Sequence, residues 1–86
     1  MDVLNKMNQI KWHPTTQGWQ AVLLNGDYIL DVWQIDRIPG GWFAGVNDRS
    51  ITKENGEDKI FCSLDFAKVA AEQLAEEMLR NYTAPR

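Results

Sequence analysis

Residues 19–35, WQAVLLNGDYILDVWQI, decide the fold of this chain, because two mainly apolar runs flank the dipeptide Asn25-Gly26. Asn-Gly tolerates the two positive φ angles of a type I′ turn, which joins antiparallel strands through a two-residue loop. We therefore predict a hairpin with strands Trp19–Leu24 and Asp27–Ile35. The turn also fixes the register of the two strands. The predicted pairs are Leu24 with Asp27, Val22 with Ile29, and Gln20 with Asp31.

Alternation along these strands separates two faces, since successive side chains of a strand point to opposite sides. One face is apolar apart from a tyrosine hydroxyl, and we expect it to form the core. It carries Trp19, Ala21, Leu23, Tyr28, Leu30 and Val32. The other face mixes polar with apolar residues. It carries Gln20, Val22, Leu24, Asp27, Ile29, Asp31, Trp33 and Ile35.

The C-terminal part of the chain predicts a helix from Leu64 to about Tyr82. Ser63 suits the N-cap, because its hydroxyl accepts a hydrogen bond from a free backbone N–H of the first turn. A broad apolar stripe recurs at helical spacing. It comprises Phe66, Ala67, Ala70, Ala71, Leu74, Ala75, Met78, Leu79 and Tyr82. Glu76 and Arg80 are spaced for a favourable (i, i+4) ion pair.

The remaining segments complete a meander. Residues 1–12 fit either a short helix or, around Ile10–Trp12, a short strand, and His13–Gly18 is expected to be a loop. Trp42–Val46 predicts a third strand after a turn. Asn47–Asp58 is a polar loop, or a hairpin that leads into a short strand at Lys59–Phe61. The expected fold is one α+β domain over residues 1–86, a three- or four-stranded antiparallel sheet with the C-terminal helix on one face and a short helix as an option at the N-terminus.

Composition narrows the classes of function. The chain has 86 residues, a net charge of −3 and one cysteine. A phosphate-binding surface normally carries a basic stripe, which is missing here, so a nucleic-acid partner is not expected. The N-terminus does not resemble a signal peptide, and no apolar run is long enough to span a membrane. A single cysteine cannot form an internal disulfide, which fits a reducing compartment. Together these features predict a cytoplasmic protein that does not bind membranes.

Residues with catalytic or metal-binding chemistry are few. A pair formed by Cys62 and His13 would lack the third, orienting residue of a nucleophilic site, and it has two ligands too few for zinc. The acidic residues that follow Asp48 do not match a calcium loop, because Lys53 and Lys59 occupy its sixth and twelfth positions. We expect no catalytic residue, no metal and no cofactor. An enzyme that depends on Cys62 is the weakest of the alternatives.

The mixed face of the hairpin is the most informative anomaly. Val22, Ile29, Trp33 and Ile35 would form an apolar patch there if nothing covers them, and exposed patches of this kind usually mark an interaction surface. Of these, Val22, Ile29 and Trp33 are the expected contact residues. Tryptophan is also enriched at binding hot spots. The patch is expected to contact a protein partner or a second copy in a homodimer. The alternative is that the N-terminal segment covers it. The residues available for such a cover are Val3, Leu4, Met7 and Trp12.

The polar side of the predicted helix offers a second candidate surface. Glu72, Glu76 and Glu77 are expected to contact a partner electrostatically, in the way that acidic rows imitate the phosphates of a nucleic acid. The alternative is an ordinary solvated helix face, since Lys68 and Arg80 interrupt the row.

The segment Phe66-Ala67-Lys68-Val69-Ala70-Ala71-Glu72-Gln73-Leu74-Ala75 resembles the second helix of the double-stranded RNA-binding domain, which has an Ala-Lys-x-x-Ala-Ala-x-x-Ala core. The resemblance extends to the element order α-β-β-β-α if residues 1–12 are helical. It implies a nucleic-acid-binding module, in which basic residues at the start of this helix hold phosphates. In this chain Leu64, Asp65 and Phe66 occupy those places, and Lys68 is the basic residue that remains.

A second resemblance covers Gly41-Trp42-Phe43-Ala44-Gly45-Val46 together with Phe61-Cys62-Ser63-Leu64 before an alanine-rich helix. These segments look like those of short proteins encoded by phages and prophages, which include anti-CRISPR and other anti-defence factors. The resemblance implies a non-enzymatic inhibitor that binds and blocks a host protein or protein complex. We take this as the leading hypothesis, with the RNA-binding module as the alternative.

Overall fold

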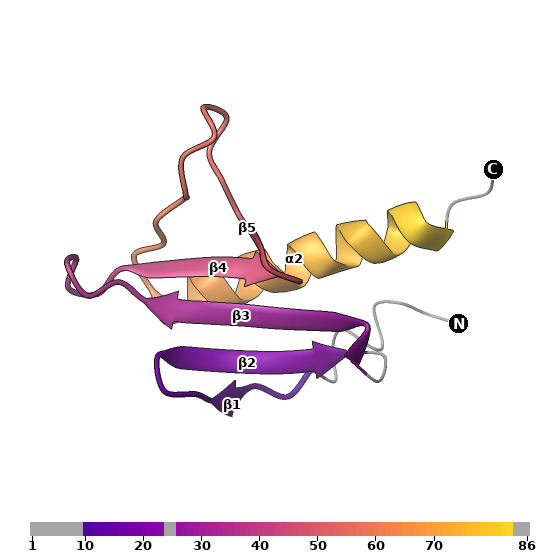
Figure 1. Cartoon of the computed structure of the whole chain (residues 1–86), viewed down its shortest axis with the longest axis horizontal. Helices are drawn as coiled ribbons and strands as arrows, with labels where there is room; N and C mark the ends of the chain where they lie inside the picture. The colour runs from indigo at the N-terminus through magenta and orange to yellow at the C-terminus, as the bar shows by residue number, and fades with distance from the viewer. Residues whose placement is uncertain (1–9, 24–25, 84–86) are drawn as a thin grey trace.

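The computed structural model describes residues 10–23 and 26–83, and it forms an α+β fold (Figure 1). Five antiparallel strands follow one another across the sheet in chain order, and one C-terminal helix lies along one face. The predicted fold class is confirmed, with more strands than expected. The elements are β1 His13–Pro14, β2 Gly18–Leu23, β3 Tyr28–Gln34, β4 Trp42–Val46, β5 Arg49–Ser50 and α2 Leu64–Thr83.

The central hairpin of β2 and β3 has the predicted register. Gln20 lies opposite Asp31, and Val22 lies opposite Ile29. Gly26 has a φ of 100°, in the left-handed region that the predicted turn requires. Leu24 and Asn25 lie outside the described residues, so the pairing of Leu24 with Asp27 does too. β4 then pairs with β3 over the predicted range and completes the meander.

The edge strand β1 corrects the expectation of a loop from residue 13 to 18. His13 pairs with Gln20, and Pro14 pairs with Trp19. Proline cannot donate a ladder hydrogen bond, and it is tolerated here because the strand lies at the edge of the sheet. The short strand expected at Ile10–Trp12 is absent, since these residues have no regular structure. The N-terminal helix falls on residues 1–9, which lie outside the described residues.

A tight turn at Asn47-Asp48 joins β4 to β5, where a polar loop was one of the two expectations. Asn47 and Asp48 have φ angles of 52° and 65°, and both residue types adopt this region more readily than most. The Asn47 side chain extends the pairing with β3 beyond the end of β4. Its Oδ1 accepts a hydrogen bond from the Ile29 N–H at 2.8 Å, and its Nδ2 donates to the Asp27 carbonyl at 3.0 Å.

Residues 51–61 leave the sheet and return to it. The segment projects away from the strands in Figure 1 and closes on itself through a bridge between Thr52 and Asp58. It comes back at Phe61, whose N–H and carbonyl exchange hydrogen bonds of 2.9 Å with Trp42. The expected strand at residues 59–61 is therefore a single bridge at Phe61.

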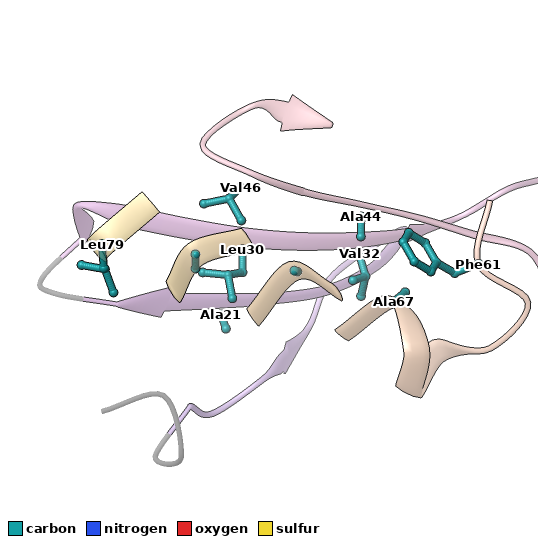
Figure 2. Close-up of a cluster of buried hydrophobic side chains, with 10 residues drawn as sticks. Ala21, Leu30, Val32, Ala44, Val46, Phe61, Ala67 and Leu79 are labelled. Atoms are coloured by element: carbon teal, nitrogen blue, oxygen red, sulfur yellow. The ribbon is translucent and has the colours of Figure 1, made fainter. Parts of the chain in front are cut away.

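Helix α2 begins as predicted. The Ser63 hydroxyl accepts a hydrogen bond from the Phe66 N–H at 3.1 Å. The side that meets β3 and β4 is a row of small residues, with Leu79 at its C-terminal end (Figure 2). The buried residues of the row are Ala67, Ala71, Ala75 and Leu79. Leu30, Val32 and Val46 fill the sheet side of this core, as Figure 2 shows.

The orientation of α2 about its own axis shows that the predicted apolar stripe was wrong at its N-terminal end. Phe66 was expected to pack inward, but 65% of its surface is exposed. The alanine row, one residue further along the chain, faces the sheet instead. Ile35, assigned to the mixed face, follows the end of β3 and is buried. None of the described helices is long and apolar enough to cross a membrane.

Candidate functional site

The sheet face opposite α2, which we term the outer face, carries the predicted apolar patch. Cross-strand pairing places side chains of equal orientation next to one another. Val22 lies beside Ile29, and Trp33 lies beside Phe43. Val22 is 52% exposed and Ile29 is 36% exposed, whereas the two aromatic side chains are partly buried. Helix α2 packs on the other side of the sheet (Figure 1), so it does not cover these residues.

Trp33 and Phe43 form an aromatic pair near one end of this surface, separated from Val22 and Ile29 by the pair Gln20 and Asp31. Their ring centroids are 5.8 Å apart and the rings are inclined by 54°, a tilted geometry that aromatic pairs favour. Phe43 was missing from the predicted site, although its alternation with Ala44 in β4 would have placed it on this face. On the other flank of Trp33, Gly18 has no room for a Cβ, which would collide with the Val32 carbonyl. The main chain there is held close to β3.

An open depression of about 360 Å³ lies next to Trp33 on the outer face. Pairing across the sheet sets Asp31, Gly45 and Ser50 in one row along its floor. Val32 and Arg49 contribute their main chain, because their side chains belong to the core face of the sheet. Arg49 is placed on that face by its pairing with the buried Val46. The remaining lining residues are Thr15, Gln17 and Asp48.

The two carboxylates of the depression, Asp31 and Asp48, differ in their surroundings. The Asp31 Oδ1 accepts a hydrogen bond from Gln20 Nε2 at 2.9 Å across β2 and β3, so the side chain is held in place. Asp48 is exposed at the turn after β4. Among the described residues neither carboxylate has a cationic partner within ion-pair distance.

Trp12, one of the residues proposed to cover the patch, lies elsewhere. Its indole N–H donates a hydrogen bond of 2.9 Å to the Glu72 carboxylate, on the flank of α2. The Lys68 ammonium lies 4.2 Å from the Trp19 ring centroid and 5.7 Å from that of Trp12, which are favourable cation–π distances. Trp12 therefore packs against the helix and not on the outer face. The other proposed cover residues, Val3, Leu4 and Met7, lie outside the described residues.

The structure separates the three carboxylates of the predicted acidic surface. Glu72 is partly buried against Trp12. Glu76 forms the predicted ion pair with Arg80. Glu77 is exposed and lines a shallow groove beside the segment 51–61. Since two of the three already have partners within the chain, they do not form one open acidic row.

A second apolar surface, which the sequence analysis missed, lies where α2 begins. Phe66, Val69 and Ile60 are exposed there around an open groove, which Cys62 also lines. His13 is in β1, at one edge of the sheet, whereas Phe61 pairs with Trp42 of β4, three strands away. His13 does not line this groove. The structure does not bring Cys62 and His13 together. In residues 10–23 and 26–83 no group of three metal-ligating side chains is present.

Comparisons with known proteins assign no family to the chain. No family model matches it, and neither a curated protein nor a solved structure matches it. The candidate site is therefore the outer face, which carries an aromatic pair, two exposed aliphatic side chains and a depression with two carboxylates.

Proposed function

We propose that this chain is a non-enzymatic binding protein, whose outer face occupies and blocks a surface of a protein partner. The observation that carries the proposal is the apolar outer face itself, which α2 leaves uncovered. Ordinary half-buried sheets are polar on the side away from the core. Here Val22 with Ile29, and Trp33 with Phe43, place two apolar pairs on that side.

The outer face contains the two kinds of residue that protein interfaces combine. Interfaces combine a central apolar and aromatic cluster with a polar rim. Here the aromatic pair and the Val22–Ile29 pair supply the apolar part, and the row of Gln20, Asp31 and Ser50 between them supplies the polar groups. Tryptophan in such a position is a frequent hot spot, where truncation to alanine costs about 2 kcal/mol or more of binding free energy.

The charges favour a protein over a nucleic acid as the partner. At the start of α2, where the RNA-binding family holds phosphates, Asp65 and Phe66 are exposed. The one basic residue of that region, Lys68, is engaged with two indole rings. The proposed setting is the cytoplasm, whose reducing conditions keep an exposed thiol such as Cys62 unpaired.

Affinity capture from a nuclease-treated host lysate tests the proposal when it includes matched surface variants. Val22→Lys places a charge on the outer face, and Val69→Lys does the same on the second apolar surface. The two side chains have similar exposure, 52% and 47%. Circular dichroism must first show that both variants remain folded.

We expect one stoichiometric protein partner that binds the wild type and Val69→Lys but not Val22→Lys. Binding lost only in Val69→Lys would move the function to the surface around Phe66. A ligand removed by nuclease would favour the RNA-binding alternative. Sedimentation of the chain alone shows whether a second copy occupies the outer face.

A further inference from the structure

The depression beside Trp33 has the chemistry of a receptor for a cation. Its side chains offer two carboxylates, two hydroxyls and one amide, and an indole ring forms part of the wall. The one cationic residue of the lining, Arg49, directs its side chain to the core face, as its pairing with Val46 indicates. The depression is therefore negatively charged, within a chain whose net charge is −3.

The floor of the depression is formed by backbone at its middle position. Gly45 has no side chain at the centre of the row formed by Asp31 and Ser50. A Cβ at Gly45 would lie 2.7 Å from the Arg49 carbonyl oxygen, so this position cannot be filled by a larger residue without a backbone shift. Backbone therefore bounds the depression at this position, and the volume open to a side chain from a partner is the depression of about 360 Å³ above it.

The geometry points to an arginine side chain of the protein partner as the occupant of this depression. The inference rests on the proposed function, because it names the chemistry that the partner must present to the outer face. A guanidinium group is planar and stacks on an aromatic ring, and its N–H groups bind several acceptors at once. Trp33 provides the ring, and Asp31 and Asp48 provide acceptors that no described cation occupies.

Arginine fits this combination better than lysine. A lysine ammonium is a compact, strongly hydrated charge. It has no planar group that could stack on a ring and bind several separated acceptors at the same time. We therefore expect the partner's arginine to be flanked by apolar residues. Its guanidinium would lie against Trp33, and the flanking residues would contact Val22 and Ile29. Opposite charge on the two surfaces would also speed their encounter at low ionic strength.

Titration of the whole chain with small probes tests the inference without the partner. The probes are acetyl-arginine methylamide, its uncharged analogue acetyl-citrulline methylamide, and acetyl-lysine methylamide, each followed by 1H–15N NMR. The variants are Asp31→Asn and Asp48→Asn, alone and together. Asparagine keeps the oxygen that accepts from Gln20, and it also tolerates the positive φ at position 48.

We expect the arginine probe to shift the Trp33 indole and Gly45 amide signals in a saturable way that weakens with added salt. The lysine probe should bind more weakly, and the citrulline probe should leave these signals unchanged. The double variant should bind the arginine probe about fivefold or more weakly, because charge-assisted hydrogen bonds are lost. Equal shifts from arginine and citrulline, or full binding by the double variant, would overturn the inference.

Capture of the partner separates this inference from the proposed function. If Val22→Lys abolishes capture and the Asp31→Asn, Asp48→Asn variant does not weaken it, the binding function stands and the arginine inference is wrong. If Val22→Lys captures the partner as well as the wild type does, the proposed function is wrong. The arginine inference is then wrong too, because it requires the partner to bind this face. A homodimer that Trp33→Ala dissociates would assign the face to a second copy and likewise overturn the inference.

Discussion

Replacing Asn47 tests how the turn between β4 and β5 is joined to the central hairpin. The Asn47 side chain makes two hydrogen bonds to the backbone of residues 27 and 29, at 3.0 and 2.8 Å, and its own N–H donates to the Ile29 carbonyl at 2.9 Å. Asn47→Ala removes both side-chain bonds and leaves an alanine at a φ of 52°. Asparagine is one of the few residues that tolerate this conformation.

The expected cost of Asn47→Ala follows from these terms. Each hydrogen bond contributes about 1 kcal/mol net, and the exposed groups at this site regain part of that from water. An alanine in the left-handed region adds about 1 kcal/mol of strain. We therefore expect a loss of about 2–3 kcal/mol in the free energy of unfolding. For a domain of this size each kcal/mol lowers Tm by about 4–8 °C.

Urea unfolding followed by circular dichroism measures this loss, and Asn47→Gly is the matched control. Glycine accepts the positive φ without strain, so Asn47→Gly should lose only the hydrogen-bond part, about 1–2 kcal/mol. Amide exchange at Ile29 should also become faster in both variants. The reasoning is refuted if Asn47→Ala is within about 0.5 kcal/mol of the wild type, the range of ordinary surface substitutions.

Three further substitutions have expected outcomes that differ in sign or size. Asp48→Gly creates the Asn-Gly dipeptide that type I′ turns prefer and removes the strain of a φ of 65°. The strain relieved, about 1–2 kcal/mol, exceeds the entropy cost of glycine, so the free energy of unfolding should rise by about 0.5–1 kcal/mol; a lower urea midpoint would contradict the turn assignment. Ala71→Leu forces extra volume between α2 and the sheet and should destabilise by about 1–3 kcal/mol in the same assay, whereas an unchanged midpoint would mean that the interface has room. Glu72→Ala removes the hydrogen-bond acceptor of Trp12 and should cost about 1–2 kcal/mol, while Glu77→Ala, at an exposed position, serves as the control with little effect. Similar losses in the two glutamate variants would show that the bond to Trp12 contributes nothing measurable.

Local chemistry made the hairpin and the helix predictable. Asn-Gly and the alternating pattern determined the register of β2 and β3, and Ser63 with the apolar period determined where α2 begins. The two edge strands escaped prediction, because each has only two residues and carries no periodicity of its own. Their pairing depends on neighbours that the sequence does not identify.

The candidate site was predictable only in part, for a physical reason. The outer position of Val22, Ile29 and Trp33 followed from the register. The rotation of the helix did not follow, because both an alanine row and a row of larger apolar residues occur at helical spacing. Close contact with the sheet selects the smaller row, and Phe66 is left exposed in consequence. The depression could not be foreseen, because it combines residues from separate turns and strands.

The alanine row has a consequence for how α2 is held along its own axis. Alanines four residues apart repeat at nearly one helical turn, so a shift of the helix by one turn replaces Ala67 with Ala71 and Ala71 with Ala75. The middle of the row thus provides little resistance to sliding. The ends do resist it, since such a shift brings the bulkier Leu79 into a place fitted to Ala75 and breaks the cap at Ser63. The axial position of the helix is therefore specified at its two ends, while its centre supplies only close contact with the sheet.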